Sequence, residues 1–107
     1  MSVKQQILKH LEEFTGEGNP DTLQAIYVKY RQSVQQKIKE LSEALPNRDF
    51  TLLYEVSHAL KGASNVVGYT EMWQHTANFV EGTKAHDISK CEIEFEHIRN
   101  LASALEE

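Results

Sequence analysis

The sequence is poor in the features that mark secreted and membrane proteins. Its single cysteine, Cys91, cannot form an internal disulfide, so nothing in the chain requires an oxidising compartment. No uncharged apolar run approaches the roughly 20 residues that span a bilayer. The first residues, MSVKQQILKH, lack the apolar segment of a signal peptide. We therefore expect a cytoplasmic protein, and the initial Met-Ser favours a free-standing one.

An excess of basic residues is also missing. Eleven Lys and Arg stand against 16 Asp and Glu, a net charge of −5, and the two signs are interleaved. This balance argues against nucleic acid or an anionic membrane surface as a partner. At 107 residues the chain is large enough for one hydrophobic core but not two, so we predict a single domain, residues 1–107, and a monomer.

Apolar residues recur at helical spacing along the first half of the chain. The first helix is expected to end at Gly16, and its apolar face comprises Val3, Ile7, Leu8, Leu11 and Phe14. Asn19 can cap a long second helix with Pro20 and Asp21 in its first turn. Pro46 is expected to end it, because the residue before a proline is pushed out of helical geometry. The apolar face of this helix comprises Leu23, Tyr27, Tyr30, Val34, Ile38, Leu41 and Leu45.

The second half carries three further helical patterns. Asp49 can cap a third helix that closes at Gly68, and its apolar face comprises Leu53, Val56, Leu60, Ala63 and Val67. A fourth helix, expected to fray between Gly82 and His86, buries Met72, Thr76, Phe79 and Val80. Asp87 can cap a fifth, with inward residues Ile88, Cys91, Phe95, Ile98, Ala102 and Leu105.

These patterns predict an all-α fold. No strand-like alternation persists, and the connections are short. Four long amphipathic helices with short connections fold most economically as an antiparallel up-down four-helix bundle. The additional short N-terminal helix would then lie across one end.

His58 is the residue of the third helix that invites a functional explanation. At roughly 100° per residue, the apolar positions of this helix cluster within an arc of about 80°, and His58 lies roughly 180° from its centre. Its imidazole should therefore face solvent or a partner. The residues one turn away, or next to it on the same face, are Tyr54, Glu55, Lys61, Gly62 and Asn65.

Two of these neighbours would suit an anion bound to the ring. Gly62 removes a side chain and leaves an open approach, and Lys61 supplies a positive charge. A neutral imidazole is a good nucleophile near neutral pH, and it can accept a phosphoryl group. This helix supplies no carboxylate cluster for magnesium, no glycine-rich phosphate loop and no nucleotide pocket. If His58 handles phosphate, another protein must bring the rest; a plain surface histidine is the alternative.

The stretch from residue 58 to residue 68, HALKGASNVVG, resembles the signature of histidine-containing phosphotransfer (HPt) domains of multistep two-component signalling. Apolar residues at the fourteenth and twenty-first positions after the histidine are matched by Met72 and Phe79. The helix start at Asn19-Pro20 and the segment Arg48-Asp49-Phe50 also fall where that family has them. The resemblance covers nearly the whole chain.

The resemblance implies a role for each matching position. His58 would take a phosphoryl group from an aspartyl phosphate on one receiver domain and pass it to the aspartate of another. Lys61 would steady that group, and Gly62 would let the receiver dock closely. Ser64 and Gly68 would serve helix packing and termination.

The resemblance also implies which partners the chain would have and which components they would supply. The partners would be receiver domains of a hybrid sensor histidine kinase and of a response regulator. The receiver would supply Mg²⁺ and the acidic residues, so the chain would need no cofactor and would have no kinase activity of its own.

One position departs from the family pattern. Many members have a glutamine or glutamate twenty-two residues after the histidine, where it can hydrogen-bond the ring. Here that position is Val80, with Glu81 next to it. Either Glu81 takes over through a small rotation of the helix, or the ring lacks this partner.

The remaining histidines do not suggest a metal site. His75, His86 and His97 recur every eleven residues but fall on different helices or at helix ends, and no two histidines have i,i+3 or i,i+4 spacing. Cys91 is predicted to be a buried small hydrophobe. Ser57 and His58 are not a catalytic pair, because consecutive helical residues diverge by about 100°.

The roles of two aromatic residues stay open. Tyr54 is predicted to be exposed beside His58, either as an anchor for a docking receiver or as an ordinary surface residue. Trp73 fits both the edge of the core and a contact surface.

Two functions of different classes follow. The first is the phosphorelay intermediate, and the second is a helical docking module that binds a receiver or another partner without accepting phosphate. His58 together with Lys61 separates them, because docking alone requires neither. A hydrolase or kinase is disfavoured, since no second catalytic group can be placed near His58.

Overall fold

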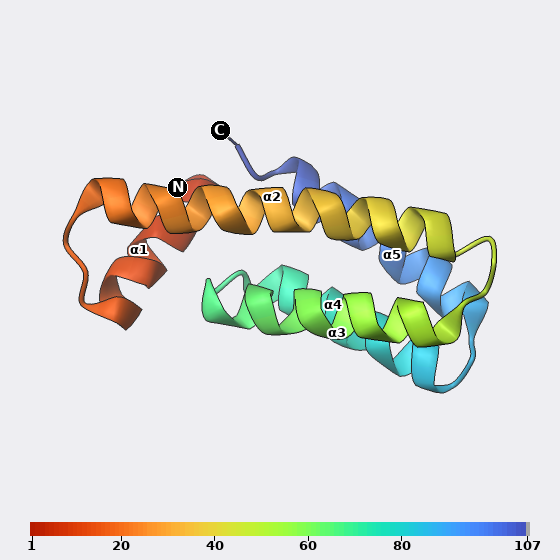
Figure 1. Ribbon diagram of the computed structural model, residues 1–107. Helices are drawn as coiled ribbons and strands as arrows, with labels where there is room; N and C mark the ends of the chain where they lie inside the picture. The colour runs from red at the N-terminus through yellow and green to blue at the C-terminus, as the bar shows by residue number, and fades with distance from the viewer. Residues whose placement is uncertain (107) are drawn as a thin grey trace.

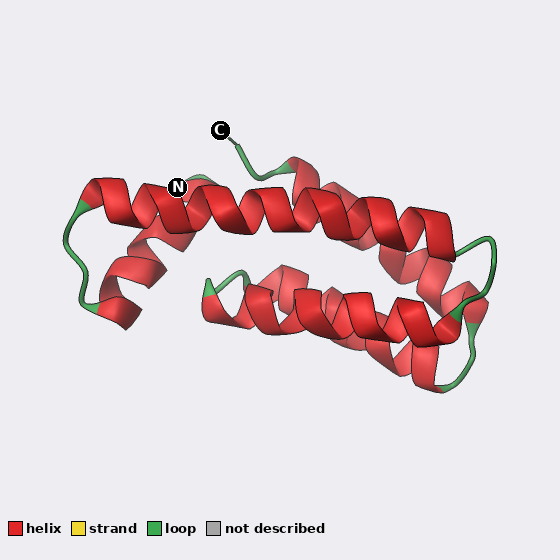
Figure 2. Cartoon of the chain, in the orientation of Figure 1, coloured by secondary structure: helices red, strands yellow, loops and turns green. Residues whose placement is uncertain are grey.

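The computed structural model describes residues 1–106, which form five helices and no strand (Figures 1 and 2). These are α1 (Val3–Thr15), α2 (Pro20–Ala44), α3 (Phe50–Val66), α4 (Thr70–Lys84) and α5 (Ile88–Ser103). The helices α2 to α5 run alternately up and down, and α1 folds back across the end where α3 turns into α4 (Figure 1). The predicted all-α bundle with an additional N-terminal helix is confirmed. Glu107, the last residue of the predicted domain, lies outside the described residues.

The helix starts follow from side-chain caps. Asn19 accepts a hydrogen bond from the Asp21 backbone N–H, and Asp49 and Asp87 do the same for the N–H three residues on. All three predicted caps are confirmed. A fourth cap was not predicted, although its spacing is a known signature: Ser2 and Gln5 form a reciprocal capping box that starts α1.

The helix ends agree only in part with the sequence analysis. Gly68 adopts the left-handed conformation predicted for it, with a φ of 74°, and Gly16, where α1 was expected to stop, is left-handed too, with a φ of 70°. Helix α2 ends before Pro46, but the expected reason is wrong, because Leu45 keeps helical dihedrals of −57° and −49°. The chain turns instead at Arg48, which has a φ of 49°.

The predicted fraying of α4 is also wrong. This helix continues to Lys84, and the chain then turns at His86, which has a φ of 52°. Gly82 and Thr83 are buried, and a Cβ added at Gly82 would lie 3.0 Å from the Cys91 sulfur. Close packing against α5 therefore holds the end of α4 in place.

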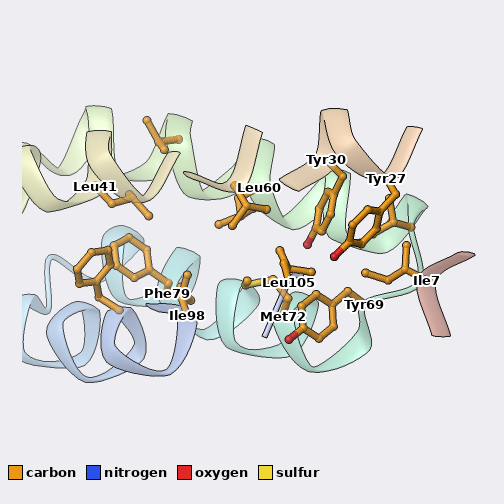
Figure 3. Packing of buried hydrophobic residues seen from close by; sticks show 14 of the residues in the cluster. Ile7, Tyr27, Tyr30, Leu41, Leu60, Tyr69, Met72, Phe79, Ile98 and Leu105 are labelled. Atoms are coloured by element: carbon orange, nitrogen blue, oxygen red, sulfur yellow. The ribbon is translucent and has the colours of Figure 1, made fainter. Parts of the chain in front are cut away.

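One hydrophobic core runs through the bundle (Figure 3). The largest side chains that are almost fully buried in it are Ile7, Leu11, Tyr27, Val34, Leu41, Leu53, Leu60, Met72, Phe79, Val80 and Ile98. Cys91 is buried as predicted. Phe14 is not: it is 68% exposed, because α1 crosses the end of the bundle and only Ile7 and Leu11 on this helix are buried.

Tyrosine hydroxyls tie the helices together inside this core. The Tyr30 hydroxyl lies 2.8 Å from the Ser64 hydroxyl and joins α2 to α3. Tyr69, in the turn before α4, donates to the Leu101 carbonyl oxygen at 2.7 Å. Within residues 1–106 every buried side-chain nitrogen or oxygen has a hydrogen-bond partner. The bonds of Tyr30 and Tyr69 join α2 to α3 and the turn after α3 to α5.

None of the helices in residues 1–106 combines the length and the apolar character that crossing a membrane requires.

Candidate functional site

His58 lies in the middle of α3 on the face opposite the core. Its side chain is exposed, as predicted, whereas Leu60 and the preceding Ser57 are buried. The Ser57 hydroxyl donates to the Tyr54 carbonyl oxygen at 3.2 Å. Ser57 therefore serves the helix and does not act with His58.

Tyr54 is the aromatic neighbour of the His58 ring. The two rings stack with their centroids 5.4 Å apart and their planes inclined by 26°. Tyr54 is 37% exposed, so it takes part in the same surface as His58. Within residues 1–106 the His58 imidazole makes no hydrogen bond or ion pair, which leaves its nitrogens open to solvent.

Neither Val80 nor Glu81 hydrogen-bonds to the His58 ring. Val80 lies where many HPt domains have a glutamine or glutamate that orients the histidine, and Glu81 follows it. Val80 is 2% exposed and belongs to the core. The Glu81 carboxylate pairs with the Lys84 ammonium at 3.5 Å, one turn further along α4. Of the two alternatives left by the sequence, the structure favours the second: the ring lacks this partner, and Tyr54 is its neighbour instead.

Lys61, one turn beyond His58, makes a contact that the sequence analysis missed. Its ammonium nitrogen lies 5.7 Å from the centroid of the Trp73 indole, in a cation–π geometry. Trp73 comes from α4 and is 37% exposed, so it lies at the protein surface rather than in the core. The cation expected beside the imidazole thus rests against a neighbouring helix.

The flank of His58 is open, as expected from Gly62. A Cβ added at this glycine would meet no atom within 4 Å. Glu55 and Asn65 are exposed on the same helix. We call the surface formed by Tyr54, Glu55, His58, Lys61, Gly62, Asn65 and Trp73 the His58 face.

Ser64 and Gly68 occupy structural positions. Ser64 is buried against Tyr30, and Gly68 is left-handed at the end of α3. A Cβ at Gly68 would collide with the ring of His10 from α1. Both also border a pocket of about 230 Å³ beside the His58 face, lined by Ser64, Asn65, Gly68, Thr70 and Trp73.

The other histidines make their contacts outside the set of residues that defines the His58 face. His75 and His97, expected to be apart, in fact meet across α4 and α5, with ring centroids 4.4 Å apart, and His75 bonds to the Glu94 carboxylate at 2.7 Å. His86 stacks on Phe50 at 4.6 Å. Within residues 1–106, no group of three or more His, Cys, Asp or Glu side chains is arranged to hold a metal ion.

The His58 face therefore combines one unpaired imidazole, one cation and clear space. An exposed imidazole can form a covalent bond to phosphorus, and a cation can balance the charge of the transferred group.

Comparisons with known proteins agree with this description. The sequence model of one protein family, described as Hpt domain, matches residues 25–107, which is more than half of the chain. The match begins within α2 and includes the whole His58 face. Neither the curated proteins nor the solved structures contain a match.

Proposed function

Because the chain belongs to the Hpt domain family, whose members transfer phosphoryl groups through a histidine in phosphorelays, we propose that it is a phosphorelay intermediate with His58 as the phosphoryl acceptor. The observation that carries this proposal is the exposed, unpaired imidazole of His58 beside the open flank at Gly62. Hpt domains are phosphocarriers that interact with receiver domains, and they are not kinases.

The proposed reaction is an exchange of one labile bond for another. A nitrogen of the neutral His58 imidazole attacks the phosphorus of an aspartyl phosphate on a receiver domain. The N–P bond forms as the acyl O–P bond breaks, and the aspartate leaves as a carboxylate. The reverse exchange passes the group to the aspartate of a second receiver. Lys61 balances part of the charge on the phosphoryl oxygens.

The His58 face is the proposed docking surface. Tyr54, Glu55, Gly62 and Asn65 surround the ring, and none of them encloses it. A receiver domain can therefore bring its aspartate, together with the Mg²⁺ and acidic residues that phosphoryl transfer requires, directly to the imidazole. The chain would then need no cofactor of its own.

We assign the two receivers to a hybrid sensor histidine kinase and to a response regulator. The chain would act between them as a cytoplasmic monomer. Its acidic surface, with a net charge of −5, suits a protein partner better than nucleic acid.

Substitution of the acceptor tests the proposal. Incubation with a phosphorylated receiver should place acid-labile phosphate on the parent protein and none on His58→Gln. Because His58 is exposed and makes no hydrogen bond within residues 1–106, the variant should keep its helicity and melting temperature. His97→Gln, an exposed histidine on α5, is the matched control and should take up phosphate normally.

Two results would count against the assignment. Phosphate uptake by His58→Gln would show that another residue is the acceptor. A parent protein that binds receivers but takes no phosphate would instead be the docking module considered above.

A further inference from the structure

The contact with Trp73 holds the Lys61 ammonium against α4, whereas the group it is proposed to serve would be bound to His58 on α3. His58 lies one turn N-terminal to Lys61 on α3. Trp73, in contrast, borders a pocket together with Ser64, Asn65 and Gly68, all of which lie C-terminal to Lys61. A lysine in a helix normally leans toward the N-terminus of its own helix, which here is the direction of His58. The indole of α4 and a group on His58 would therefore compete for the same ammonium.

We propose that Trp73 is a positioning residue that retains Lys61 while His58 is unmodified and releases it to the phosphoryl group once that group is in place. This inference rests on the proposed function of His58. It assigns Trp73 to the control of Lys61, and not only to the docking surface.

The balance of interactions supports such a release. A cation–π contact at an exposed site shifts an equilibrium by about two- to fivefold, and Trp73 is 37% exposed. A phosphoryl group is more than singly charged near neutral pH, and hydrogen bonds between two charged groups are about twice as strong as neutral ones. The ammonium should therefore prefer the indole before phosphorylation and the phosphoryl oxygens afterwards.

The residues around Lys61 and Trp73 leave room for the Lys61 side chain to move toward His58. Gly62, next to Lys61, has open space where a side chain would stand. The His58 ring is occupied by Tyr54 on its N-terminal side, so the C-terminal side that faces Lys61 is the accessible one. Removal of the indole should thus raise the fraction of time that Lys61 spends near His58.

The first test follows the lysine directly by NMR. Ring currents should shift the ε-methylene protons of Lys61 upfield in the unmodified protein, and Trp73→Leu should remove that shift. Phosphoramidate then phosphorylates His58 without a receiver: its N–P bond breaks, an N–P bond to the imidazole forms, and ammonia leaves. On modification, confirmed by a phosphorus resonance, the Lys61 protons of the parent should move to the position of an unshielded lysine.

The second test measures the rate at which phosphoramidate phosphorylates His58. Trp73→Leu should raise this rate by up to about two- to fivefold, the range of the lost contact, because Lys61 no longer has to leave the indole to reach the phosphoryl group. In a Lys61→Ala background the same substitution should have no effect. Trp73→Phe keeps a smaller aromatic ring and should fall between the parent and Trp73→Leu.

The inference and the proposed function fail in different ways. Unshifted Lys61 protons in the unmodified protein, or protons that stay shifted after confirmed phosphorylation, would overturn the role of Trp73 and leave the acceptor assignment intact. An equal effect of Trp73→Leu in both backgrounds would overturn it too. Absence of phosphate on His58 would instead overturn the proposed function, and the release step with it.

Discussion

At the scale of single residues, an aromatic ring contacts each of the two proposed functional side chains, His58 and Lys61. Tyr54 stacks on the His58 imidazole, and Trp73 lies under the Lys61 ammonium. A stacked ring restrains the plane of an imidazole but occupies neither of its nitrogens. A hydrogen-bonding carboxylate or amide would occupy one. The stack with Tyr54 can therefore orient His58 while both nitrogens remain available.

Gly62 offers a test that separates stability from docking. Its surroundings are empty and it lies inside a helix, so Gly62→Ala should stabilise the fold by about 1 kcal/mol. For a domain of this size the melting temperature should rise by about 4 °C or more. The added methyl group stands on the His58 face, so transfer from a phosphorylated receiver should slow. Thermal unfolding and receiver-dependent transfer rates measure the two effects.

Phosphoramidate is the control for Gly62→Ala, because this small donor requires no docking. Its reaction with His58 should proceed at the parent rate. A slower reaction with phosphoramidate as well would show that the methyl group disturbs the ring itself. Unchanged transfer from the receiver would remove the docking role of Gly62.

The residues of the site differed in how far they could be predicted. The outward direction of His58 and the burial of Ser57 follow from the angular position of each residue within one helix. The contact of Lys61 with Trp73 depends on how far α4 is shifted along α3. Periodicity within a single helix contains no information on the offset between two helices.

At the scale of helices, α1 is fitted to the turn between α3 and α4. The ring of His10 from α1 occupies the place that a side chain at Gly68 would take. Gly68 also has a φ of 74°, which disfavours any other residue. A single glycine thus ends α3 and makes room for α1.

Substitutions at this contact should separate the two effects. Gly68→Ala should cost about 1–2 kcal/mol for the left-handed backbone, and more for the collision with His10. Combined with His10→Ala, the same substitution should cost only the backbone part. Urea unfolding of the single and double variants measures the difference. Equal costs in both backgrounds would show that the His10 ring gives way freely.

Helix starts were more predictable than helix ends. A cap such as Asp49 or Asp87 bonds to a backbone N–H only three residues away, so the signal is local. Other features depend on a partner helix. Phe14 is exposed because α1 crosses the bundle end at an angle that leaves its last turn in solvent. Helix α4 continues to Lys84 because Gly82 packs on Cys91 of α5.

At the scale of the whole molecule, several acidic hydroxyl and thiol groups are held neutral in the core. Burial raises the pKa of the Cys91 thiol from 9.0 to about 11 and that of the Tyr69 hydroxyl from 10.0 to about 12. Burial raises the pKa of Tyr30 as well. These groups belong to α5, to the turn before α4 and to α2, so ionisation of any one of them would place a charge between packed helices.

The bundle should therefore lose stability at alkaline pH. Because the folded-state pKa of Cys91 is raised, its contribution is fully present below pH 9.0 and is lost as the pH rises toward about 11. Over that window the unfolded chain holds fewer protons than the folded one, so the free energy of unfolding falls, by at most about 1.4 kcal/mol per pH unit for this group. The tyrosines extend this fall in the free energy of unfolding above pH 10, since 10.0 is the ordinary value of their pKa.

Cys91→Ala separates the thiol from the tyrosines. The smaller side chain should lower the free energy of unfolding at every pH, because it leaves a cavity in the core. Its loss of stability between pH 9 and 10 should nevertheless be shallower than that of the parent, because the variant has no thiol to ionise on unfolding while the tyrosines contribute equally in both proteins. Urea unfolding at intervals of half a pH unit measures both slopes. Parallel curves for the two proteins would mean that the thiol ionises as readily in the bundle as in the unfolded chain, which its burial between α4 and α5 should prevent.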